Sequence, residues 1–186
     1  MRIVFATSEA NPYIKSGGLA DVLGSLPKAL VQKGHECIVV LPKYQDMKLA
    51  DTLEYVTNYD IWVGWRKCYC GVFKAEYDGV TYYFIDNEQY FRRPGLYGYD
   101  DDNERFAYFD FAVLELLSHI DIKPDILHLH DWQTAMIATL YKERYAYYEY
   151  YQGIKIVFTI HNIAYQGKCD PALLSDHFGL DNYLYY

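Results

Sequence analysis

The stretch Lys15-Ser16-Gly17-Gly18-Leu19-Ala20-Asp21-Val22 decides the fold, because it joins a short apolar run to an apolar helical pattern. The run, residues 2–7, is typical of a buried strand, and leucine and valine then recur at helical spacing through residues 19–30. Gly17 and Gly18 permit a positive φ in the turn and leave no Cβ in the way of a ligand. The free amides at the helix start, with the charge of Lys15 beside them, therefore predict a diphosphate site.

The glycine turn alone is weak evidence for a ligand. A tight strand-to-helix turn with a solvated lysine would have the same residues. The stretch is neither the G-x-G-x-x-G pattern of dinucleotide sites nor the G-x-x-x-x-G-K-S/T phosphate loop. Its interpretation therefore depends on the motifs that follow.

Composition narrows the class of protein. The 186 residues suit one domain, and a hydrophobic content of 52% is sufficient for a sizeable core. The formal net charge of -8 makes a general attraction to nucleic acid or anionic membrane unexpected. The sequence contains no apolar run of membrane-span length and no signal-peptide pattern, so we expect a cytoplasmic protein.

The four cysteines lack a recurring C-x-x-C spacing. Cys68 and Cys70 fall on one face of an expected strand, but the sequence offers no nearby second pair of zinc ligands. We expect reduced cysteines that pack in the protein.

The rest of the chain predicts an α/β fold, a Rossmann-like parallel sheet flanked by helices. Residues 36–41, ended by Pro42, complete a βαβ unit. Residues 55–85 predict a β-rich insertion, with Asp78-Gly79 as a turn and residues 80–85 returning into the main sheet. Residues 86–102 predict a long loop of the kind that is functional or mobile.

The second half predicts two more helices and two more strands. A helix from an Asn103 cap to about residue 119 should bury an apolar stripe. A strand at 125–129 precedes a helix from about Gln133, whose tyrosine-rich end at 141–151 should bury its rings and keep its hydroxyls in water. Residues 155–160 predict the last strand.

Three polar clusters follow the expected strands: residues 15–21, 128–132 and 161–162. Ligands of open α/β sheets bind beyond the carboxyl ends of the strands, so this shared edge predicts a site. Each cluster has a plainer alternative. His128 and His130 could be one buried, hydrogen-bonded ring and one exposed ring, Asp131 could cap a helix, and His161 could satisfy backbone groups.

At these residues the chain resembles the N-terminal part of the bacterial glycogen and starch synthase family of GT-B glycosyltransferases. Ser16 replaces the threonine that is common in the family's K-T-G-G-L motif and keeps the hydroxyl. The similarity extends from Met1 to about Gly167. It rests on the opening strand with Ser8-Glu9 and on three motifs that follow in the expected order, Lys15-Ser16-Gly17-Gly18-Leu19-Ala20-Asp21-Val22, His128-Leu129-His130-Asp131-Trp132-Gln133 and Phe158-Thr159-Ile160-His161-Asn162-Ile163-Ala164-Tyr165-Gln166-Gly167.

The resemblance implies retaining transfer of glucose from ADP-glucose to the non-reducing end of an α-1,4-glucan, in glycogen biosynthesis, without a metal or cofactor. It places Asp131 and His161 next to the reacting carbon as catalytic residues. The choice of ADP-glucose over UDP-glucose rests on the family likeness alone. The substrate-binding residues that it implies are Lys15, Gly17, Gly18, Asp21, Tyr97 and Asn162.

Family members continue through the rest of this domain and then through a second GT-B domain. The resemblance therefore implies that residues 1–186 are an N-terminal domain, incomplete at its C-terminus, without the domain that supplies most of the nucleotide pocket. We expect the 186 residues alone to be inactive, to bind ADP-glucose weakly if at all and to expose an apolar patch.

Two other classes of function stay open. A metal-dependent hydrolase could use His128, His130 and Asp131, although the carboxylate adjoins the second histidine and further ligands would have to come from His161 or from distant residues. A carbohydrate-binding or regulatory module could keep the domain and lack the chemistry, and the abundant tyrosine favours that alternative.

Overall fold

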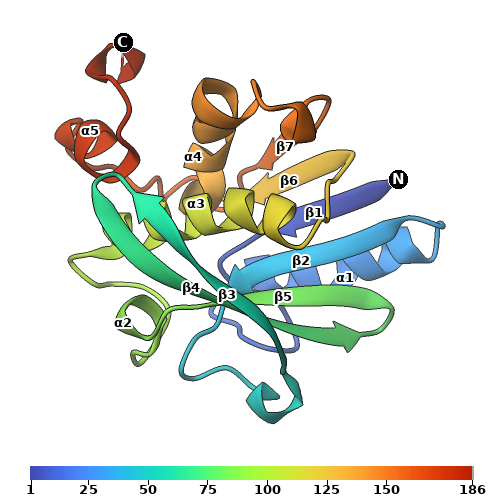
Figure 1. Ribbon diagram of the computed structural model, residues 1–186. Helices are drawn as coiled ribbons and strands as arrows, with labels where there is room; N and C mark the ends of the chain where they lie inside the picture. Colours follow the sequence, from blue (N-terminus) through green and yellow to red (C-terminus); the bar gives the residue numbers. More distant parts are fainter. Residues whose placement is uncertain (186) are drawn as a thin grey trace.

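Seven strands form one mixed sheet in the order β3-β4-β5-β2-β1-β6-β7, in a computed structural model that describes residues 1–185 (Figure 1). The pairs β5–β2, β2–β1, β1–β6 and β6–β7 are parallel, whereas β3–β4 and β4–β5 are antiparallel. The predicted α/β fold is confirmed. The strands are β1 (Arg2–Ala6), β2 (Glu36–Pro42), β3 (Glu54–Val63), β4 (Arg66–Tyr77), β5 (Val80–Asp86), β6 (Ile126–His130) and β7 (Lys155–Thr159).

Helices cover both faces of the sheet. Helix α1 packs against β2 and β5 on one face. On the other face, α3 packs against β3, α4 packs against β6, and the two helices pack against each other (Figure 1). The helices are α1 (Gly18–Val31), α2 (Glu88–Phe91), α3 (Asp102–His119), α4 (Trp132–Leu140) and α5 (Ala172–Phe178). No helix within residues 1–185 combines the length and the apolar character needed to cross a membrane.

The β-rich insertion forms as the sequence predicts. Asp78 and Gly79 both have positive φ, 52° and 78°, which is the requirement of the tight turn that joins β4 to β5. Strand β5 then returns beside β2 in parallel register, with Thr81 opposite Ile38. The insertion thus extends the parallel core with an antiparallel hairpin, β3–β4.

Helix α3 is buried on nearly all sides, not along a single stripe. It lies between β3 and α4, and even Arg105 is fully buried, where its guanidinium donates to the carbonyls of Tyr90 and Leu96. The expected Asn103 cap is wrong: the helix begins at Asp102, and no side chain caps it. Arg105 instead ties the helix to the preceding segment, so the predicted long loop is anchored and contains the short helix α2.

The tyrosine-rich segment after α4 differs from the prediction. A π-helical turn (Tyr141–Tyr145) and a 3₁₀ turn (Glu149–Tyr151) replace a continuous helix. The hydroxyls of Tyr145, Tyr150 and Tyr151 donate to Glu115, Leu117 and Leu114 on α3. These tyrosines therefore fasten the segment to α3, and their hydroxyls are bonded to protein groups, not left in water.

Candidate functional site

The three polar clusters meet at the carboxyl ends of β1, β6 and β7, which are adjacent strands in the sheet. The backbone N–H of His161 donates to Oδ1 of Asp131 at 2.7 Å, which joins the clusters after β6 and β7. The hydroxyl of Tyr97 lies 2.7 Å from Oγ of Ser8, just beyond β1. The shared edge predicted from the sequence is therefore present.

The glycine turn is occupied by a carboxylate of the protein itself. Glu9, only 3% exposed, accepts hydrogen bonds from the backbone N–H groups of Ser16 and Gly17 and from the Ser16 hydroxyl. This acidic residue is the third residue after the end of β1, and its position beyond a strand end is the sequence signal that could have identified it. An anion that binds here therefore meets two amides, those of Ser16 and Gly17, that already have Glu9 as a partner.

Neither glycine of the turn adopts the positive φ that glycine permits. Gly17 has an extended backbone, with φ of −147°, and Gly18 begins α1 with φ outside the positive range. A Cβ at Gly18 would meet no atom within 4 Å, so the protein's own packing leaves open space above that residue. The turn therefore offers room for a ligand and does not depend on left-handed backbone.

Lys15 and Asp21 form an ion pair at the same place. Their Nζ and Oδ2 atoms are 2.6 Å apart, and Asn11 also donates to Asp21, at 2.7 Å. Both charged side chains are about half exposed, and such a pair contributes about 0–1 kcal/mol. A diphosphate could thus draw Lys15 away from Asp21 at little cost. No side chain caps the start of α1.

Asp131 has an unusual backbone and an unexpected partner. Its φ of 59° with ψ of −179° is rare for a residue other than glycine. The carboxylate makes no capping bond to α4 and instead accepts from the N–H groups of His161 and Asn162, at 2.7 and 3.3 Å. Within residues 1–185 both bonds go to Oδ1, and Oδ2 has no protein partner.

Three histidines, His128, His130 and His161, lie side by side next to Asp131. Nδ1 of His130 is 2.8 Å from Nε2 of His161, and the rings of His128 and His130 have centroids 4.2 Å apart. Burial, followed by repulsion from His128 and His161, lowers the pKa of His130 to about 3. Burial, followed by repulsion from His161, also lowers the pKa of His128.

The alternative that one of His128 and His130 is buried and the other exposed is correct for the buried ring and wrong for the exposed one. His130 is fully buried, but His128 is half-buried and its Nε2 lies 2.8 Å from the hydroxyl of Thr159. The plainer alternative for His161 also differs from the structure, because its ring pairs with another imidazole. No group of three or more His, Cys, Asp or Glu side chains in the described part of the chain is arranged to hold a metal ion.

Tyr97 and Asn162 have structural partners. Burial raises the pKa of the half-buried Tyr97 hydroxyl, and the charge of Glu9 acts in the same direction. Oδ1 of Asn162 accepts from the N–H of Ala164 at 3.1 Å and so closes the turn after β7. The roles of both residues toward a substrate stay predictions.

Comparison with known proteins finds relatives that match nearly the whole chain. The family model described as the starch synthase catalytic domain matches residues 2–186. A glycogen synthase of Clostridium kluyveri is 51% identical over 187 residues, covering 100% of this chain and 39% of the relative. A glycogen synthase of Desulforamulus reducens is 50% identical over 184 residues, covering 98% of this chain and 38% of the relative.

Among solved structures, the catalytic domain of starch synthase IV from Arabidopsis thaliana, bound to ADP and acarbose, has a TM-score of 0.90 and 36% identity. That similarity covers 98% of this chain and 38% of the plant chain. The chain thus spans about two fifths of the length of the proteins it matches. By the extent of these matches, it belongs to the starch synthase catalytic domain family.

Proposed function

We propose that this chain is the N-terminal domain of a glycogen synthase, which transfers glucose from ADP-glucose to the non-reducing end of an α-1,4-glucan with retention. The observation that carries the proposal is the junction of Asp131 and His161 beside the glycine turn, at the edge where β1, β6 and β7 end. Family membership supports the reaction class. The ADP and acarbose bound to the plant starch synthase support a nucleotide sugar as donor and a glucan as acceptor.

The glycine turn is proposed to hold the diphosphate of the donor. The leaving diphosphate gains negative charge as the glycosidic bond breaks, and a lysine and helix N–H groups stabilise that charge most at the transition state. Lys15 would leave Asp21 and pair with the diphosphate. Gly17 and Gly18, which have no side chains, would let the diphosphate approach the start of α1. Asp21 would keep Lys15 in place when the site is empty.

Asp131 and His161 are proposed to act on the sugar. The free Oδ2 of Asp131 would stabilise positive charge that develops at the anomeric carbon. The His161 imidazole would orient the glucosyl group by a hydrogen bond, which favours the reactive geometry. Tyr97 and Asn162 would contact the sugar or the acceptor at the same edge.

Activity is proposed to need residues beyond these 186. The relatives carry more than half of their length outside the matched region, and in a two-domain GT-B enzyme that part would cover the nucleotide. A cytoplasmic location is part of the proposal and is supported by four free cysteines.

The test is a chimera in which residues 1–186 replace the matching region of the Clostridium kluyveri relative. We expect ADP-glucose-dependent elongation of glycogen, slower with UDP-glucose, and no elongation by the 186 residues alone. His161→Ala and Asp131→Asn should each lower kcat by on the order of 100-fold or more. Glucan binding by a folded chimera without any transfer would instead favour a carbohydrate-binding module.

A further inference from the structure

The side chain of His130 is enclosed and has one hydrogen-bond partner. It is fully buried, and its Nδ1 atom lies 2.8 Å from Nε2 of His161. The other ring nitrogen, Nε2, is buried and has no partner within residues 1–185. A buried histidine with one bonded and one unbonded nitrogen restricts where its proton can be.

His130 holds a single ring proton at neutral pH. Burial and the two neighbouring imidazoles lower its pKa to about 3, so the charged form is excluded in the folded state. A neutral imidazole donates from one nitrogen and accepts at the other. The short contact with His161 therefore needs a proton on one side and a lone pair on the other.

Two placements of the proton satisfy that contact. If His130 is protonated on Nε2, a buried N–H is left with no acceptor, and His161 must donate. If His130 is protonated on Nδ1, the unbonded Nε2 is a lone pair, and His161 accepts. Buried N–H groups without a partner are rarer than buried acceptors without one, so the second placement is favoured.

We propose that His130 is a positioning residue whose Nδ1–H donates to His161 and fixes the His161 proton on Nδ1. This inference rests on the proposed function for its consequence, because it makes Nδ1 of His161 a hydrogen-bond donor toward a sugar hydroxyl. Nδ1 of His161 has no protein partner in the described chain. The backbone N–H of His161 is held by Asp131, so the ring is fixed at two points, at the backbone and at Nε2.

The other groups around the pair leave this arrangement intact. His128 packs against the His130 ring and bonds the Thr159 hydroxyl, so it does not compete for Nδ1 of His130. Phe5 contributes an apolar ring 6.0 Å from His130. In the part of the chain that the structure describes, no carboxylate is hydrogen-bonded or ion-paired to either ring, and the charged groups that shift the pKa of His130 are the two other histidines.

The first measurement is the tautomer of His161 in the 186-residue chain, by long-range ¹H–¹⁵N correlation of the histidine rings at neutral pH, with the His161 signals assigned by His161→Ala. We expect Nδ1–H at His161 and Nδ1–H at His130. His130→Leu removes the donor, and His161 should shift toward the Nε2–H form that free histidine prefers. His130→Asn places an amide N–H near the lost Nδ1 and should restore Nδ1–H.

His128→Leu is the matched control, because it removes a ring that packs on His130 but no bond to His161. It should leave the His161 tautomer unchanged. An Nε2–H signal at His161 in the unsubstituted chain overturns the inference even if a variant fails to fold. If the His161 tautomer changes as much in His128→Leu as in His130→Leu, the inference is also overturned, because packing would then set the tautomer.

The catalytic readout uses the glycogen synthase chimera. His130→Leu should lower kcat about tenfold with little change in KM, the effect of one misdirected hydrogen bond, and His130→Asn should recover most of it. An unchanged kcat in His130→Leu would contradict the positioning role. An inactive unsubstituted chimera would count against the proposed function alone, since the tautomer is measured without substrate.

Discussion

At the residue scale, two carboxylates organise the site by binding backbone amides. Glu9 holds the N–H groups of Ser16 and Gly17, and Asp131 holds those of His161 and Asn162. Hydrogen bonds to a charged group contribute about 1.5–3 kcal/mol each, more than neutral ones. The glycine turn and the segment after β7 are therefore fixed in place before any ligand binds.

His130 should make the stability of the chain fall at mildly acidic pH. Its pKa is about 3 in the folded chain and near the ordinary histidine value when unfolded, so between these limits the unfolded state binds the extra proton. The free energy of unfolding from this group should then decrease by about 1.4 kcal/mol for each pH unit below 6.5. Urea unfolding of the unsubstituted chain and of His130→Asn, from pH 7.5 to 5, measures this decrease in the free energy of unfolding.

The unsubstituted chain must be compared with His130→Asn because Asp110 changes the stability with pH in the opposite direction. Burial raises the pKa of Asp110, so its contribution to stability is lost as pH rises. His130→Asn should remove only the histidine slope, and His119→Asn, at the exposed end of α3, should keep it. Equal slopes in the unsubstituted chain and His130→Asn would show that His130 is protonated in the folded state.

The sequence could predict the place of the site but not its internal bonds. Lys15, Asp131 and His161 follow strands, so the carboxyl-end rule brings them to one edge. The bond between His130 and His161 spans 31 residues and depends on the parallel register of β6 and β7, which sequence patterns do not specify. Glu9 was missed as the partner of the glycine turn because that contact depends on how the loop after β1 folds back.

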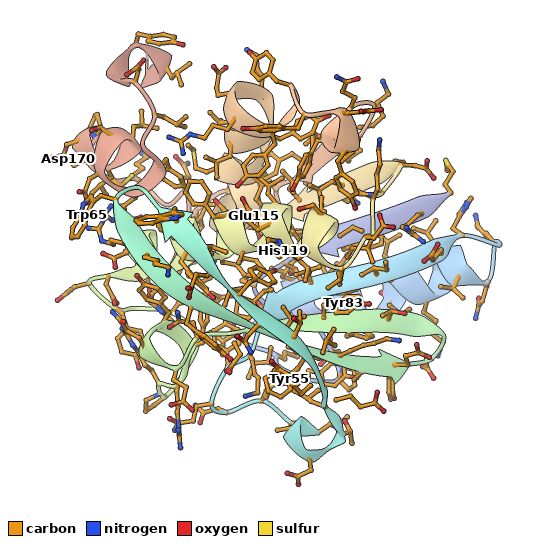
Figure 2. The ribbon with its side chains drawn as sticks, viewed as in Figure 1. Tyr55, Trp65, Tyr83, Glu115, His119 and Asp170 are labelled. Atoms are coloured by element: carbon orange, nitrogen blue, oxygen red, sulfur yellow. The ribbon has the colours of Figure 1, made fainter. Side chains whose placement is uncertain are left out.

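At the scale of elements, the β3–β4 hairpin anchors the C-terminal helix. Figure 2 shows Trp65 at the hairpin tip, next to the segment that carries Asp170. The indole of Trp65 donates to Asp176 at 2.9 Å, and the Arg66 guanidinium pairs with the same carboxylate at 2.8 Å. These bonds, led by that of Arg66, lower the pKa of Asp176 to about 2. The turn predicted at Asp78-Gly79 could be found from local sequence, whereas this long-range contact could not.

Gly64→Ala should release α5 from the hairpin. Gly64 has φ of +58°, and a Cβ there would lie 2.1 Å from the carbonyl oxygen of Asp176, a backbone atom that cannot turn aside. Gly95→Ala is the matched control, since Gly95 has φ of +73° and open space around its Cβ position. The control should cost about 1–2 kcal/mol for its left-handed backbone.

Hydrogen exchange and thermal unfolding distinguish the two variants. Gly64→Ala should lose more stability than Gly95→Ala, and its α5 amides should exchange faster while those of α1 are unchanged. Equal stability losses with unchanged α5 exchange would show that the hairpin tip does not hold the helix.

At the scale of the whole molecule, the sheet has an apolar edge at β7. Val157 and Phe158 in the strand, and Ile160, Ile163 and Tyr165 after it, are between 41% and 71% exposed. Strands of parallel sheets are normally buried on both faces, and an open apolar edge offers unpaired backbone groups to another chain. The exposed patch expected from the family likeness thus has a place in the fold, although no local pattern in residues 155–160 indicated which side would be open.

This edge should make the 186-residue chain self-associate, and one charge on it should weaken the association. Phe158→Lys puts an ammonium group on the apolar strand, where a second copy could bury it only at the cost of desolvating the charge. Trp62→Lys is the control, because Trp62 is 61% exposed on β3, at the opposite edge of the sheet. Sedimentation velocity over a range of concentrations should show oligomers for the unsubstituted chain and Trp62→Lys and a larger monomer fraction for Phe158→Lys. If Trp62→Lys alone restored the monomer, the β3 edge would be the one that associates, and the apolar surface at β7 would not drive the self-association.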